Sequence, residues 1–123
     1  MFTPDHKQIA ESWLTVQRHW WAYYAVSKIV KTRPQEALSL VIVLLELANS
    51  PEDLRDIGCG PLEDLLRLHA ASVIDTIEST AANNAQLRTA LSHVWFSQGE
   101  DSLNQRVEAL GCTILKPRGP GDA

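Results

Sequence analysis

The stretch "PQEALSLVIVLLELA", residues 34–48, carries the strongest structural signal in the chain. After its first turn, only Ser39 and Glu46 interrupt an otherwise apolar run. The β-branched residues at 41–43 would also suit a strand, but the sequence shows no partner strand. A helix that is apolar on every side is normally buried on every side. We therefore predict that residues 34–48 form a central helix around which the rest of the chain packs.

Before this central helix, residues 5–33 contain no Gly or Pro, and their first half has one apolar stripe made by Ile9, Trp13, Val16 and Trp20. A straight helix of that length would span roughly 43 Å at about 1.5 Å per residue. That is long for so small a domain, so we predict a break near Arg18–Trp21, followed by a second apolar face from Ala22 to Val30. The tripeptide Thr3-Pro4-Asp5 is predicted to start the first helix, and Thr32 with Gln35 to cap the central one.

After the central helix, turn-forming residues divide the chain into shorter helices. Ser50-Pro51 opens one that is predicted to stop at Gly58 in a left-handed conformation. Gly60-Pro61 opens the next, with Leu62, Leu66, Val73 and Ile77 on its buried face. Asn84 caps another, whose apolar stripe continues through Trp95 until Gly99. A last helix covers residues 103–110, and residues 112–115 suit an extended segment.

The predicted fold class is therefore all-α, with six or seven helices packed as antiparallel hairpins around residues 34–48. Residues 1–115 are expected to form a single helical domain, and residues 116–123, rich in Gly and Pro, a flexible tail.

Composition and charge restrict the location and the class of partner. Two cysteines far apart and no secretory signal predict a cytoplasmic protein with reduced thiols. The longest apolar run, residues 40–45, is too short for a membrane span. The net charge is −4, and residues 1–33 carry five basic and two acidic side chains, so the remainder is strongly acidic. Nucleic acid needs a cationic face, so neither nucleic acid nor membrane is expected as partner, whereas a basic protein is.

The stretch "DIGCGPLEDLL", residues 56–66, looks most like a functional motif. Its glycines match neither phosphate-binding fingerprint, and Glu63 and Asp64 would repel an anion from the following helix start. The same acids oppose a thiolate at Cys59, so we expect an inert, packed cysteine. The motif is interpreted as a corner between two helices.

Catalysis and metal binding have no support in the sequence. The four histidines, at positions 6, 19, 69 and 93, lack the spacing of metal ligands. Glu63 and Asp64 are adjacent, so on a helix they point about 100° apart and do not converge. We therefore predict no enzyme, no catalytic residues, no metal and no cofactor.

Two features suggest a binding surface. Five acids, which also suit helix starts through the dipole, fall within thirteen residues: Glu52, Asp53, Asp56, Glu63 and Asp64. The aromatic run "HWWAYY", residues 19–24, cannot place all its rings on one helix face. We expect Trp20 and Tyr24 to join the core, which leaves Trp21 and Tyr23 at the surface as interface anchors unless another helix covers them.

"GPLEDLL" (60–66) and "LRTALSHVW" (87–95) resemble a family of small bacterial proteins of unassigned function. The likeness spans roughly residues 9–96 and includes Trp13, Pro34 and the closing Trp95. The family often has a glycine after the histidine of the motif helix, where this chain has Ala70. The resemblance implies a helical domain and carries over no activity.

These observations lead to one main hypothesis and two alternatives. The main hypothesis is a small acidic protein that occludes a basic partner, such as an immunity protein or antitoxin of a toxin. Its partner-binding residues would be the five acids, with Trp21 and Tyr23. The alternatives are a homo-oligomeric adaptor, for example a homodimer joined by the aromatic run, and a small-molecule binder or enzyme with a pocket between helices.

Overall fold

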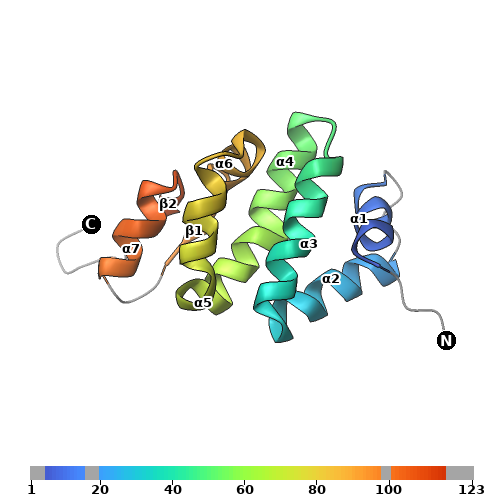
Figure 1. Cartoon of the computed structure of the whole chain (residues 1–123), viewed down its shortest axis with the longest axis horizontal. Coiled ribbons are helices and arrows are strands. Elements are labelled where there is room, and N and C mark those ends of the chain that lie inside the picture. The colour runs from blue at the N-terminus through green and yellow to red at the C-terminus, as the bar shows by residue number, and fades with distance from the viewer. Residues whose placement is uncertain (1–4, 16–19, 98–100, 116–123) are drawn as a thin grey trace, which may run out of the picture.

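The protein is seen here as a computed structural model that describes residues 5–15, 20–97 and 101–115 (Figure 1). Within these ranges the order of elements is α1 (His6–Leu14), α2 (Trp20–Thr32), α3 (Pro34–Leu47), α4 (Pro51–Ile57), a π turn (Gly58–Leu62), α5 (Glu63–Ala81), α6 (Ala85–Leu91), β1 (Trp95–Phe96), α7 (Asp101–Ala109) and β2 (Thr113–Ile114). The all-α fold class is confirmed. The predicted tail, residues 116–123, lies outside the described residues, and the single domain over 1–115 stays a prediction.

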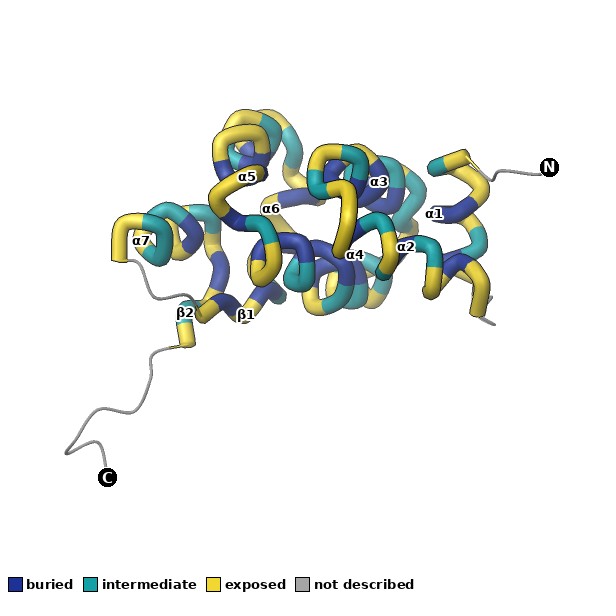
Figure 2. Tube along the Cα trace, turned by 90° about the horizontal axis from the view of Figure 1, so that it is seen from below, coloured by how far each residue is buried: buried dark blue, intermediate teal, exposed yellow. Residues whose placement is uncertain are grey.

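Helix α3 has the central position that its sequence predicts. It packs against α1, α2 and α5 and also touches α4 and α6. Leu40, Leu44 and Leu45 are fully buried, while Ser39 and Glu46 face solvent. In Figure 1, α1 and α2 lie at one end of the molecule and α7 with β2 at the other, with α3 to α6 between them. Figure 2 shows that buried residues follow the inward faces of the helices and exposed residues the outward faces.

The starts of α1 and α3 differ from the predictions. Asp5, rather than Thr3, caps α1, and its carboxylate accepts from the Gln8 N–H at 2.8 Å; residues 1–4 lie outside the described part of the chain. The predicted Thr32 cap of α3 is wrong, because the Thr32 hydroxyl donates back to the carbonyl of Lys28 at 2.7 Å. The residue before Pro34 is Arg33, which makes no capping bond.

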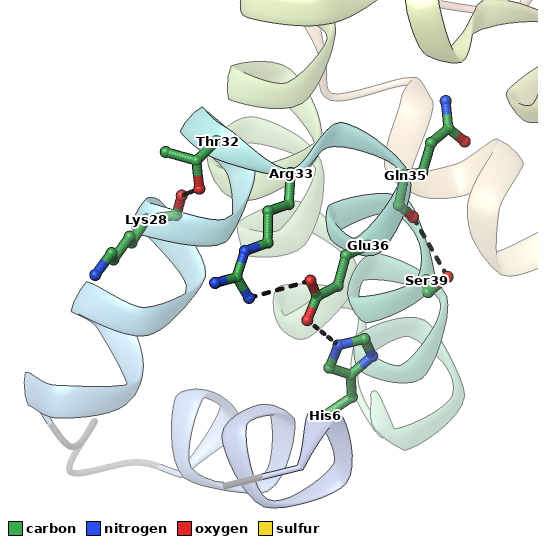
Figure 3. A network of polar contacts seen from close by, with 7 residues as sticks. All are labelled: His6, Lys28, Thr32, Arg33, Gln35, Glu36 and Ser39. Carbon is green, nitrogen blue, oxygen red and sulfur yellow. Dashed lines mark hydrogen bonds and ion pairs between the residues drawn. The ribbon is translucent and has the colours of Figure 1, made fainter. Parts of the chain in front are cut away.

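An ion-pair network holds the start of α3 instead. Glu36 accepts from Arg33 at 3.3 Å and contacts His6 of α1 at 3.2 Å, from two sides of its carboxylate (Figure 3). The bond to His6, assisted by Arg33 against the opposing effect of burial, lowers the pKa of Glu36. This contact ties α1 to α3.

The first two helices are separate, as predicted, but α1 already ends before the predicted place near Arg18–Trp21, where Trp20 and Trp21 belong to α2 and residues 16–19 lie outside the described part of the chain. Helix α1 ends at Leu14, and α2 begins at Trp20. Ile9 and Trp13 are buried as predicted, but Trp20 is 79% exposed. The error arises because a stripe drawn through one continuous helix loses its phase when the helix restarts. Within α2 the predicted face is confirmed by the burial of Ala22, Val26 and Val30.

The corner at residues 58–62 is a π turn that joins α4 directly to α5. Gly58 was expected in a left-handed conformation, which is wrong: its φ of −64° and ψ of −52° are helical. The glycine is needed for space, since a Cβ there would lie 2.1 Å from the carbonyl oxygen of Ala90 in α6. Gly60 departs from helical geometry, with φ −108° and ψ −106°. A second kink lies at His69, so α5 consists of two helical stretches.

The segment after α6 also differs from its prediction. The helix ends at Leu91 and the chain becomes extended at β1, so Trp95 does not continue the helical stripe; the expected stop, Gly99, is not among the described residues. Successive side chains of a strand point to opposite sides, and here Phe96 is 1% exposed while Trp95 is 59% exposed. Strands β1 and β2 pair in parallel, with Trp95 opposite Thr113. The predicted last helix and the extended segment after it are confirmed.

Candidate functional site

The beginning of α5 lies between two hollows. Glu63 and Asp64 are adjacent in the sequence, and each carboxylate lines one of these hollows. Asp64 lines a hollow of about 100 Å³, which we call the Tyr23–Asp64 hollow. Glu63 lines a cleft of about 330 Å³, which we call the Glu63–Trp95 cleft. The sequence argument that these two carboxylates diverge is confirmed.

The Tyr23–Asp64 hollow is formed where α2 crosses the π turn and the start of α5. Its walls are Tyr23, Val26, Ser27, Val30, Gly60, Pro61 and Asp64. Tyr23 is 49% exposed and stacks on the buried Trp13, with ring centres 6.0 Å apart and ring planes at 20°. Asp64 accepts from the Arg67 guanidinium at 2.8 Å. The hollow therefore combines an immobilised aromatic face, an apolar floor and a carboxylate.

The Glu63–Trp95 cleft lies between the π turn and α5 on one side and the strands β1 and β2 with their flanking residues on the other. Its lining residues are Cys59, Glu63, Arg67, His93, Trp95, Ser97 and Leu115. Glu63 accepts the backbone N–H of Trp95 at 2.8 Å, so the carboxylate fixes β1 against α5. Sequence reasoning missed this cleft, because the strand that forms one wall was taken for helix. The extended segment predicted at residues 112–115 was the only available signal that a strand could pair here.

Thiol, imidazole and carboxylate groups line this cleft together, which the sequence did not anticipate. Cys59 is exposed, so the prediction of a packed cysteine is wrong. The described residues show no hydrogen bond between Cys59 and His93, which is the contact that a nucleophile and its base use. Nor does the described part of the chain hold three His, Cys, Asp or Glu side chains placed to bind a metal.

The buried cysteine is Cys112, after α7. Burial raises its pKa to about 12, and the negative charge of Glu63 adds to the shift. A thiol in this state is not a nucleophile near neutral pH.

The remaining predicted acids lie on α4, where Asp53 and Asp56 have local partners. Glu52 and Asp53 occupy the first turn of α4, where the dipole favours them. Asp53 accepts the Asn49 N–H at 3.0 Å, and Asp56 pairs with Arg55 at 3.3 Å. Glu52 is exposed. The structure thus separates the five acids into the α4 group and the two hollows beside α5.

The aromatic run has a different arrangement from the one predicted. Trp20 and Tyr24 do not join the core: they stack on each other at the surface, 5.8 Å apart with ring planes at 11°, and are 79% and 59% exposed. Trp21 and Tyr23 are exposed as expected, at 41% and 49%. Only small or branched side chains of α2 point inward, which lets the helix approach its neighbours closely. Next to Tyr24, a hollow of about 230 Å³ is lined by Lys28 and Lys31.

No helix of the described residues has both the length and the apolar character to cross a bilayer. No curated protein and no solved structure matches the chain. A family model does match: it describes a family of unknown function, DUF6869, and aligns with residues 10–113. That range runs from within α1 to the first residue of β2. It includes the π turn and the Tyr23–Asp64 hollow, whereas Leu115 of the Glu63–Trp95 cleft lies just beyond it. Because the match covers most of its length, the chain belongs to this family of unknown function.

Proposed function

We propose that the protein acts by binding a basic protein partner and covering its functional surface, as an immunity protein or antitoxin does. The observation that carries this proposal is the Tyr23–Asp64 hollow. There, two of the residues expected to contact a partner, one aromatic and one acidic, line the same depression.

The hollow suits the end of an arginine or lysine side chain. The alkyl stem would lie along Val26, Val30 and Pro61, while the charged head meets the Asp64 carboxylate beside Arg67, which already donates to it at 2.8 Å. The exposed face of Tyr23 offers a cation–π contact to the same head. Tyr23 loses little freedom on binding, because its stack with Trp13 already holds the ring.

Charge supports the same class of partner. The net charge is −4, and the acids of α4 lie outside the hollow, where they would increase the rate of encounter rather than the lifetime of the complex. Trp21 is also exposed on α2, but it lies two residues from Tyr23 and therefore faces another side of the helix.

The test separates anchoring from steering. The partners to be examined are the basic proteins encoded beside the gene, with association followed by surface plasmon resonance over a salt series. Tyr23→Ala is expected to increase the dissociation rate about 10- to 30-fold, because it removes a central aromatic anchor. Replacing Glu52, Asp53 and Asp56 together by their amides is expected to slow association at low salt and leave dissociation nearly unchanged.

Glu46→Gln is the matched control, since Glu46 is an exposed acid of α3 that lines neither hollow. The proposal fails if Tyr23→Ala and Glu46→Gln have the same kinetics, or if no neighbouring basic protein binds.

Self-association is the second candidate, and the exposed Trp20–Tyr24 stack favours it. Two large rings exposed side by side are unusual on a monomer unless they meet a partner. Light scattering over a dilution series tests it, with Trp20→Ala as the variant that should shift the equilibrium to monomer. A wild-type protein that is monomeric at micromolar concentration removes this candidate.

A further inference from the structure

The Glu63–Trp95 cleft has the volume and the walls of a binding site that neither the family nor the hollow described above accounts for. Its volume of about 330 Å³ is at the lower end of the range for small-ligand sites. Trp95 and Leu115, two large apolar side chains on its walls, are 59% and 44% exposed. Apolar surface left open beside a carboxylate is the feature to be explained.

Only one of the two carboxylate oxygens of Glu63 accepts a hydrogen bond from the described residues. Its Oε1 accepts the Trp95 N–H at 2.8 Å, while its Oε2 has no hydrogen-bond donor or cation among the described residues. A carboxylate can accept several hydrogen bonds, so Oε2 remains available to a ligand.

Trp95 is exposed and yet held in place. The backbone N–H of Trp95 donates to Glu63. The strand that contains Trp95 pairs with β2 through the hydrogen bond from the Thr113 N–H to the Val94 carbonyl, which is 2.9 Å long. The Leu115 N–H binds the Phe96 carbonyl at 2.8 Å and continues the same pairing. The indole therefore stands on a fixed backbone, which lowers the entropic cost of stacking a ligand on it.

The chemistry of these walls selects a cation on an alkyl chain. An indole is the aromatic ring that attracts cations most strongly, a free carboxylate oxygen supplies the counter-charge, and Leu115 offers an apolar track for methylene groups. An anion would meet Glu63. Of the described residues that line the cleft, Arg67 alone carries a guanidinium, and it donates to Asp64 at 2.8 Å.

We propose that the Glu63–Trp95 cleft binds the alkylguanidinium or alkylammonium group of an arginine or lysine side chain. The two consecutive carboxylates at the start of α5 would then each bind a cation: Asp64 in the Tyr23–Asp64 hollow and Glu63 in the Glu63–Trp95 cleft. The assignment of the side chain to a protein partner rests on the proposed function, whereas the chemistry of the cleft does not. A partner that fills both hollows presents two basic side chains, one to each flank of the α5 start.

The experiment uses the full-length protein without any partner. N-acetyl-arginine amide is titrated into it, and the indole N–H signals are followed by NMR, with the Trp95 signal assigned from Trp95→Phe. The expected result is a saturable shift of the Trp95 signal in the millimolar range, as befits a single weak contact. The matched neutral probe is N-acetyl-citrulline amide, which has the same shape without the charge and is expected to bind roughly tenfold more weakly.

The key variant is Glu63→Gln, whose side-chain oxygen can still accept the Trp95 N–H. It is expected to weaken arginine amide binding roughly tenfold while leaving the thermal unfolding midpoint close to that of the wild type. Glu46→Gln is the matched control, since it removes an exposed carboxylate of α3 that lines neither hollow and should leave the Trp95 shift intact. If Glu63→Gln unfolds the protein, the comparison of arginine with citrulline on the wild type decides.

Equal binding of citrulline, or no shift of the Trp95 signal with arginine amide, overturns the proposal, as does a folded Glu63→Gln that binds like the wild type. A cleft that binds arginine amide in a protein that binds no basic partner would leave this inference standing and remove the proposed function. If partner binding depends on Tyr23 and Asp64 but arginine amide causes no shift of the Trp95 signal, the proposed function stands and the inference about the Glu63–Trp95 cleft fails.

Discussion

At the scale of single residues, the π turn requires a residue without a Cβ at position 58. The backbone there is ordinary helix, and the space for a side chain is taken by the Ala90 carbonyl of α6. Gly111 is the opposite case: its φ of 101° is the left-handed region that favours glycine, and a Cβ there would touch nothing within 4 Å. The same residue type thus serves two physical needs.

Substituting each glycine by alanine separates these needs. Gly58→Ala is expected to cost roughly 3 kcal/mol or more of unfolding free energy, because α4 and α6 must move apart. Gly111→Ala is expected to cost only about 1 kcal/mol, from backbone strain alone. Urea denaturation measures both. Asparagine, which tolerates left-handed geometry, should restore part of the loss at Gly111 and none at Gly58.

The two cysteines should differ in reactivity for a reason visible at the same scale. Cys59 is exposed, whereas Cys112 is buried, with a pKa raised to about 12 by that burial. Thiol titration with a chromogenic disulfide at neutral pH is expected to modify one cysteine in the native protein and both in denaturant. Cys59→Ser should abolish the native reaction. A native Cys59→Ser protein that still reacts promptly would contradict the burial of Cys112.

At the scale of elements, Arg106 of α7 forms ion pairs with two acids of α5. Arg106 donates to Glu78 at 3.1 Å and also pairs with Asp75, which lies one turn earlier on α5. These contacts raise the pKa of Arg106, while the hydrogen bond from Arg106 is the main cause that lowers the pKa of Glu78. The groups are partly exposed, so solvent and salt weaken the attachment.

The sign of the pH dependence follows from the lowered pKa of Glu78. A carboxyl whose pKa is lower in the folded state stabilises the fold at pH values above its unfolded pKa, which is 4.5 for glutamate. That stabilisation is lost as the pH falls through 4.5 toward the folded pKa. Hydrogen exchange should therefore show α7 losing protection in this acid range, and Arg106→Met should lose it already at pH 7 and respond less to acid.

Arg55→Met is the matched control for this measurement. Arg55 is also paired with an acid, at 3.3 Å, but its partner Asp56 belongs to the same helix. Its replacement should leave the protection of α7 unchanged. Equal loss in both variants would show that the effect comes from net charge and not from the attachment of α7.

At the scale of the whole molecule, the elements depend unequally on one another. Within the described residues, α3 packs against α1, α2 and α5 and also touches α4 and α6, whereas the main contacts of α7 are with α5 and β2. Both contribute fully buried side chains, Leu44 from α3 and Val107 from α7. A cavity created at a buried side chain of α3 is therefore expected to loosen the packing of most other helices. A cavity at a buried side chain of α7 should loosen only the packing around α7 and β2.

This difference predicts two patterns of destabilisation. Leu44→Ala is expected to cost about 2–5 kcal/mol and to lower hydrogen-exchange protection in α1, α2 and α5 together. Val107→Ala should lower protection mainly in α7 and β2, with a smaller effect on global stability because fewer methyl groups are removed. A uniform loss across all helices in Val107→Ala would mean that the C-terminal end unfolds only with the rest.

Local signals in the sequence were sufficient for much of the fold. The apolar run at 34–48 predicted the central helix, and Ser50 and Asn84 begin helices where their cap chemistry predicts. The divergence of Glu63 and Asp64 also follows from the 3.6-residue helical repeat alone. These features need only information carried by neighbouring residues, such as propensity, capping and periodicity.

Tertiary structure alone decided the rest. The reason for Gly58 is a carbonyl 32 residues away in sequence, and the outward position of Trp95 follows from strand pairing with residues near the C-terminus. The candidate site has the same origin, since its two hollows join α2 and β1 to the start of α5. Contacts between distant segments leave no periodic trace, because each depends on where a helix restarts, bends or gives way to a strand.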